Sequence, residues 1–135
     1  MESVLVVATD PERALLVAIL TGAGYSTIEA SEGATGVRKI LDESPVIIVM
    51  AEEVPPVNGI GYLPFVRHLT DALIVVVGPG GESRVSRALF QGADAYVARP
   101  VDDSELLARF NSLRRRERSR VSKSKGQTAR FQIEC

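Results

Sequence analysis

The sequence predicts an α/β fold built on one open, doubly wound parallel sheet of five strands. Short apolar runs alternate five times with segments of helical period along the chain. Three of the runs contain mainly Val, Ile and Leu without polar alternation, as expected of strands that helices cover on both faces. Five such βα units in about 115 residues imply right-handed crossovers, with a binding edge at the carboxyl ends of the strands.

The strands are expected where the apolar runs lie. The second and fifth runs are shorter and more mixed in composition, which favours edge positions in the sheet. The five expected strands are Val4–Val7, Ser26–Glu29, Val46–Met50, Leu73–Val77 and Ala95–Val97.

The first three helices begin or end at recognisable signals. Asp10 is expected to be the N-cap of the first helix, with Pro11 at its first position and an acid in its first turn. Ser31 is expected to cap the second helix, which should end before Pro45. Pro64 predicts that the third helix begins late or is irregular, because proline is tolerated only near the first turn.

The last two helices have clearer boundaries. The fourth is expected over 82–91 and is closed by Gly92, which can adopt the left-handed conformation that often ends helices. The fifth opens at the acidic run that begins with Asp102 and turns Leu106 and Phe110 toward the core.

Charge divides the chain into an acidic body and a basic tail. Residues 1–113 hold 8 Lys+Arg and 15 Asp+Glu, whereas residues 114–135 hold 8 and 2. We therefore expect one domain over 1–115, followed by a basic polar tail or linker over 116–135 that is flexible. A nucleic-acid arm is disfavoured because the tail lacks interleaved aromatic residues and belongs to no DNA-binding motif.

Several classes of protein are disfavoured by composition. No apolar run approaches the ~20 residues that cross a bilayer, and no basic segment leads into a signal-peptide core. The lone Cys135 fits a reducing compartment, so a cytoplasmic location is expected. One histidine, His68, and a terminal cysteine cannot form a nucleophile–base pair, so we expect no enzyme and no cofactor.

Four motifs, in order, resemble the receiver domains of two-component response regulators. That resemblance covers residues 3 to about 115 and implies a flavodoxin-like (βα)5 fold with strand order 2-1-3-4-5. The matching segments are Ser3–Val7 followed by Asp10–Glu12, Ala23–Tyr25 with Glu29–Gly33, Val54–Gly59, and Gly92–Pro100.

The resemblance also identifies where phosphotransfer chemistry should be. The family uses an acid pair that holds Mg²⁺, an acceptor Asp, a hydroxyl residue and a Lys, which together neutralise and clamp a phosphoryl group. Here the corresponding positions form a degenerate phosphorylation site: Ala8, Thr9, Asp10, Ala51, Gly78 (or Val77) and Arg99. Without a carboxylate at position 51 no acyl phosphate can form there, so the sequence predicts a pseudo-receiver.

Two alternatives stay open at this edge. Asp10 could be a residual metal ligand, although the helix cap accounts for it without a metal. Glu52 or Glu53 could be a built-in negative charge that pairs with Arg99 and fixes one state. The simpler interpretation is a solvated acidic loop, and strand alternation argues against Glu52 pointing where Ala51 points.

The predicted function is a phosphorylation-independent protein-interaction module in signal transduction. The resemblance implies a partner-binding face formed by the fourth helix, the fifth strand and the fifth helix, which a homodimer could also use and in which Tyr96 is half-buried. The residues assigned to this face are Tyr96, Arg87, Phe90 and Pro100. The expected partner is another signalling protein or a fused output domain. The alternatives are a switch that binds an anion or small ligand at the degenerate site, and a flavodoxin-like cofactor enzyme.

Overall fold

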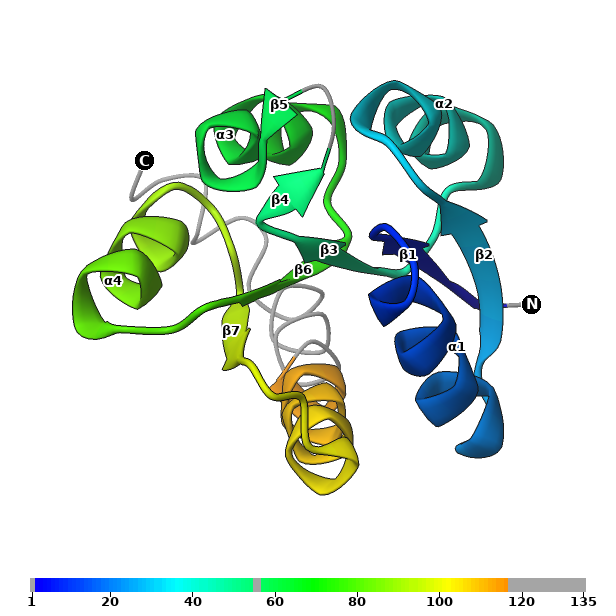
Figure 1. Ribbon diagram of the computed structural model, residues 1–135. Coiled ribbons are helices and arrows are strands. Elements are labelled where there is room, and N and C mark those ends of the chain that lie inside the picture. The colour runs from blue at the N-terminus through cyan, green and yellow to red at the C-terminus, as the bar shows by residue number, and fades with distance from the viewer. Residues whose placement is uncertain (1, 55–56, 117–135) are drawn as a thin grey trace, which may run out of the picture.

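The computed structural model describes residues 2–54 and 57–116, with the side chains of 57–61 left out. Its central sheet has five parallel strands in the order β2-β1-β3-β6-β7 (Figure 1). Because β6 and β7 are the fourth and fifth strands of this sheet, the predicted order 2-1-3-4-5 is confirmed. The strands are β1 (Ser3–Val7), β2 (Ser26–Ala30), β3 (Ile47–Ala51), β6 (Leu73–Gly78) and β7 (Ala95–Ala98).

Helices cover both faces of this sheet, which makes the fold a doubly wound one. One face carries α2, α3 and α4, and the other carries α1 and the helix over 103–116 (Figure 1). The helices with defined bounds are α1 (Glu12–Gly22), α2 (Gly33–Glu43), α3 (Gly59–Leu69) and α4 (Glu82–Phe90). A small antiparallel pair, β4 (Glu53–Val54) and β5 (Val57–Asn58), lies between β3 and α3 and was not predicted.

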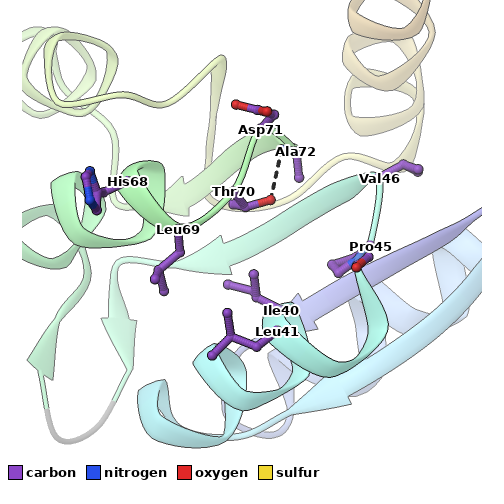
Figure 2. Close-up of a pocket in the computed structure, with 10 residues that line it drawn as sticks. Ile40, Leu41, Pro45, Val46, His68, Leu69, Thr70, Asp71 and Ala72 are labelled. Carbon is purple, nitrogen blue, oxygen red and sulfur yellow. Dashed lines mark hydrogen bonds between the residues drawn. The ribbon is translucent and has the colours of Figure 1, made fainter.

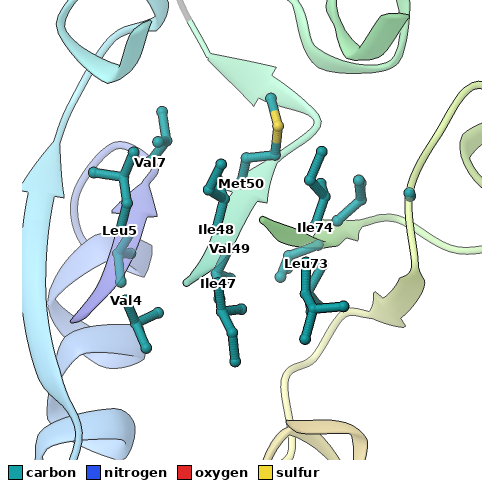
Figure 3. Close-up of a cluster of buried hydrophobic side chains, with 14 of the residues drawn as sticks. Val4, Leu5, Val7, Ile47, Ile48, Val49, Met50, Leu73 and Ile74 are labelled. Atoms are coloured by element: carbon teal, nitrogen blue, oxygen red, sulfur yellow. The ribbon is translucent and has the colours of Figure 1, made fainter. Parts of the chain in front are cut away.

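The core consists of the aliphatic strands and the helix faces that pack on them. Val4, Leu5, Ile48 and Ile74 have no exposed surface, and Figure 3 shows such side chains in successive layers across β1, β3 and β6. Phe110, in the helix over 103–116, is fully buried and packs edge-on against Tyr25, with ring centroids 5.4 Å apart. The continuous aliphatic strands therefore lie at the centre of the sheet, where helices cover both of their faces.

Two expectations about helix caps were wrong. Pro11, not Asp10, is the N-cap of α1, and the Asp10 carboxylate instead pairs with Arg13 at 3.0 Å. Glu32, not Ser31, is the N-cap of α2. The helix α3 begins at Gly59, so it does not begin late, and it contains Pro64.

Candidate functional site

The strand register brings the degenerate site together at the carboxyl edge of the sheet. Ala51 is the last residue of β3 and is paired with Val77 of β6, and Gly78 is paired with Ala98 of β7. The N–H of Arg99 donates to the carbonyl of Gly78 at 2.9 Å. Ala8 follows β1, whose Val7 is paired with Met50. The predicted positions are therefore neighbours, and Gly78 rather than Val77 is the terminal residue of its strand.

The acceptor and metal positions present methyl groups and one exposed hydroxyl residue. Ala51 is 2% exposed and Ala8 is fully buried, whereas Thr9 is exposed. Asp10 keeps a carboxylate, but its side chain is 62% exposed and bound to Arg13. No group of three His, Cys, Asp or Glu residues within 2–54 and 57–116 is placed to hold a metal ion.

Arg99 lies between two carboxylates that come from different loops. Its Nε and Nη2 donate to Glu12 at 2.7 and 3.0 Å, and Nη2 and Nη1 donate to Glu53 at 2.6 and 3.1 Å. The hydrogen bonds to Glu12 and then to Glu53 raise the pKa of Arg99, and the bond to Arg99 lowers the pKa of Glu53. The guanidinium fork thus ties the start of α1 to the segment after β3.

The pairing of Glu53 with Arg99 is the alternative that the sequence had left open. Glu12 had been assigned only to the first turn of α1, and its role in holding Arg99 was missed. No local signal could have revealed it, because 87 positions separate the two residues in the chain.

Glu52 is buried, so the interpretation of this residue as part of a solvated loop was wrong. Only 5% of it is exposed, and its carboxylate accepts hydrogen bonds from the Tyr96 hydroxyl and from Arg84 of α4. The Tyr96 hydroxyl in turn accepts a hydrogen bond from the N–H of Gly80 at 3.0 Å. Burial raises the pKa of the Tyr96 hydroxyl, and the hydrogen bond to Glu52 raises it further.

Gly78 leaves the space in which this cluster forms. A Cβ atom built on Gly78 would overlap both the Glu52 carboxylate and the Tyr96 hydroxyl. The absence of a side chain at position 78 therefore lets the Glu52 carboxylate and the Tyr96 hydroxyl meet in this arrangement.

Comparisons with known proteins found sequence relatives and solved structures of similar fold. No family model matches the chain. The transcriptional regulatory protein KdpE of Mycobacterium tuberculosis is 36% identical over 119 residues, which are 86% of this chain and 52% of KdpE. The chain thus spans about half the length of the curated relatives it matches.

Solved structures share the fold at low identity. A two-component response regulator from Clostridium difficile has a TM-score of 0.80 at 21% identity, over 87% of this chain and 98% of that chain. The receiver domain of Francisella response regulator 1452 has a TM-score of 0.79 at 23% identity, over 87% and 99%. Both solved structures show the fold that this chain shares.

The surface that the sequence assigned to partner binding is only partly as expected. Phe90 at the end of α4 is 91% exposed, and Arg87 and Pro100 are exposed as well. Tyr96 was expected to be half-buried in this face, but it is 6% exposed and its hydroxyl points inward to Glu52. Tyr96 can therefore shape the face from below but contributes little surface to it.

A groove of about 580 Å³ lies at the opposite edge of the sheet, between the ends of α2 and α3 (Figure 2). Leu41, which is 61% exposed, lies beside it, and Asp71 and His68 contribute polar groups. Nothing links this groove to the degenerate site at the carboxyl edge. Within the described part of the chain, no helix is both long and apolar enough to cross a membrane.

Proposed function

We propose that this receiver domain has lost phosphorylation and acts as a phosphorylation-independent protein-interaction module. The observation that carries this proposal is Ala51 at the end of β3, where the resemblance places the acceptor aspartate. An acyl phosphate forms only on a carboxylate oxygen, and the methyl group of alanine supplies no nucleophile.

The surrounding residues do not fit the magnesium ion that the family implies. Mg²⁺ requires hard oxygen ligands in near-octahedral geometry. Ala8 provides no side-chain oxygen, and the carboxylates of Glu12 and Glu53 already bind Arg99. Arg99 itself, at the position of the family's lysine, meets two carboxylates rather than an open anion site. Both features favour an edge that needs neither metal nor phosphoryl group to keep its shape.

The face around α4 is the proposed site of partner binding. Phe90 offers a large apolar side chain and Arg87 a nearby cation, a combination that is common at the centres of protein interfaces. Relatives of about twice this length are named transcriptional regulatory proteins, which supports an output domain, fused or separate, as the partner. The acidic balance of residues 1–113 favours a basic contact surface on that partner.

Treatment with phosphodonors tests the loss of phosphorylation directly. The 135-residue chain is incubated with Mg²⁺ and acetyl phosphate and then weighed by intact mass spectrometry. In parallel, the amide spectrum is recorded with Mg²⁺ and with beryllofluoride. We expect no phosphoryl mass gain and no saturable shifts at Ala8, Ala51 or Gly78, because position 51 carries no carboxylate to accept the group.

Two controls make these negative results meaningful. A receiver domain that retains its acceptor aspartate must gain the phosphoryl mass in the same mixture. A triple variant with Ala8→Asp, Thr9→Asp and Ala51→Asp tests whether the three replacements account for the loss. A phosphoryl gain on the unaltered chain would overturn the proposal. Saturable shifts without a mass gain would also count against it and would favour the anion-binding switch.

A further inference from the structure

We infer that Glu52 is an internal anion that fixes α4 and the loop 78–81 against the sheet, acting through Tyr96 and Arg84. Its carboxylate lies where three separate segments of the chain meet. One oxygen binds the Tyr96 hydroxyl of β7, and the other binds the guanidinium of Arg84 on α4. The three residues are called the Glu52 cluster below.

The Glu52 cluster also holds the loop that leads into α4. The Tyr96 hydroxyl donates to Glu52 and accepts from the N–H of Gly80 at 3.0 Å. A single hydroxyl therefore connects the end of β3 to the loop 78–81 by way of β7. Because Arg84 lies in the first turns of α4, the same carboxylate restrains this helix at a second point.

Burial makes the cluster difficult to open. Glu52 is 5% exposed and Tyr96 is 6% exposed, so a carboxylate that lost its donors would remain buried without compensation. Arg84 is 54% exposed and partly hydrated, so its tie to Glu52 should contribute less than the tie from Tyr96. Tyr96 is accordingly the main partner of Glu52, and Arg84 extends the restraint to the helix.

Gly78 decides whether the cluster can form. Any residue with a Cβ atom at this position would overlap the Glu52 carboxylate and the Tyr96 hydroxyl. A hydroxyl residue at position 78 and the Glu52 cluster therefore exclude one another in this arrangement. The missing hydroxyl at position 78 and the inward position of Tyr96 are therefore linked, because the first leaves the space that the second needs.

The consequence concerns the outer surface of α4. With both Arg84 and the preceding loop restrained, the exposed side of the helix is kept in one arrangement without any covalent modification. The Glu52 cluster shares no residue with the ion pairs of Arg99, which tie α1 to Glu53. This restraint would operate whichever partner binds, so it goes beyond the proposed function and can be tested apart from it.

The test compares matched variants of the whole chain by amide NMR and hydrogen exchange. Tyr96→Phe removes the hydroxyl, and Gly78→Ser adds a Cβ where the cluster lies. The control for the second is Gly22→Ser, since a Cβ on Gly22 meets nothing within 4 Å. Gly78 does not have a positive φ, so its substitution tests the overlap and not backbone strain.

Both test variants should release the loop and the helix. We expect the Gly80 amide to shift and the amides of 82–90 to exchange about tenfold faster or more, as the loss of a buried hydrogen bond to a charged group implies. Gly22→Ser should match the unaltered chain. Arg84→Gln should produce a smaller acceleration, and Arg87→Gln, on the same helix, should produce none.

The inference is overturned if Tyr96→Phe leaves the Gly80 amide and the exchange of α4 within about twofold of the unaltered chain, well below the expected effect. If Gly78→Ser does not fold, Glu52→Gln provides the second variant, and it must accelerate exchange in the same amides. Phosphorylation detected by mass with a normal response of α4 would overturn the proposed function alone. A rigid α4 in every variant, with no phosphorylation, would overturn only this inference.

Discussion

Single residues at the carboxyl edge change its electrostatics without changing the fold. Arg99 shows this most clearly, because a planar fork with five donors can bind two carboxylates where a lysine would present one point charge. Glu12 and Glu53 each take two of its hydrogen bonds. The edge is therefore closed by an arginine and two acids.

The ion pair of Glu53 should be visible as a pH dependence of stability. Its pKa is lowered from about 4.5, chiefly by the hydrogen bond to Arg99, so the stabilising contribution is present above that pH and is lost as the pH falls through the folded-state pKa. Glu53→Gln should flatten the loss of stability below about pH 4.5. Urea unfolding at a series of pH values measures this slope, with the exposed Glu43→Gln as the control. An unchanged slope in Glu53→Gln would contradict the assignment.

The proposed loss of phosphorylation rests on single residues that are visible in the sequence, but the contacts made at this edge could not be predicted from it. Ala51 at a strand end is sufficient to exclude an acyl phosphate once the resemblance is known. The inward position of Glu52 depends on Tyr96, 44 positions away, and on the empty space at Gly78. Strand alternation correctly separated Glu52 from Ala51, yet it gave no sign that a buried partner was present on the other side.

At the scale of elements, Arg67 joins α3 to the strands that follow it. Its guanidinium donates to the carbonyls of Thr70, Ala72 and Gly92 and to the carboxylate of Asp94 at 3.1 Å. The aliphatic stem of Arg67 also lies against Gly92, where a Cβ would come within 3.0 Å of it. One side chain therefore sets the spacing between α3 and the turn before β7.

Arg67→Met should keep most of the stem packing and remove all of these hydrogen bonds. We expect a loss of about 2–3 kcal/mol in the free energy of unfolding, because several carbonyls and a carboxylate lose a charged donor. The control is Arg38→Met on the exposed side of α2, which should change stability by less than about 0.5 kcal/mol. Urea unfolding with an unchanged m-value measures both. Equal effects of the two substitutions would show that Arg67 is not a structural tie.

Strand ends and helix starts were both predicted to within about one residue, but the residues expected to cap α1 and α2 were wrong. An aliphatic run such as that of β6 has no other favourable environment than a sheet covered on both faces, so its bounds follow from composition. A helix cap is decided by which acceptor reaches the first N–H groups, and Asp10 is drawn away by Arg13. Local propensity is thus overridden where a side chain has a competing charged partner.

Across the whole molecule, the carboxyl edge of the sheet lies next to α4, which carries the proposed partner-binding surface. The Glu52 cluster connects the two, because it lies at the edge and restrains α4, whose end carries Phe90. We therefore expect stability and partner binding to depend on different residues. Phe110, which is fully buried, and Phe90, which is 91% exposed, allow this to be tested.

Phe110 and Phe90 have the same side chain, but truncating them to alanine should change the free energy of unfolding by very different amounts. Phe110 is fully buried against Tyr25, so Phe110→Ala should cost about 3–5 kcal/mol of unfolding free energy. Phe90 is 91% exposed, so Phe90→Ala should change stability by less than about 0.5 kcal/mol. Urea unfolding followed by circular dichroism measures both. If Phe90→Ala destabilises the chain as Phe110→Ala does, Phe90 belongs to the packing of α4 and is removed from the proposed binding face.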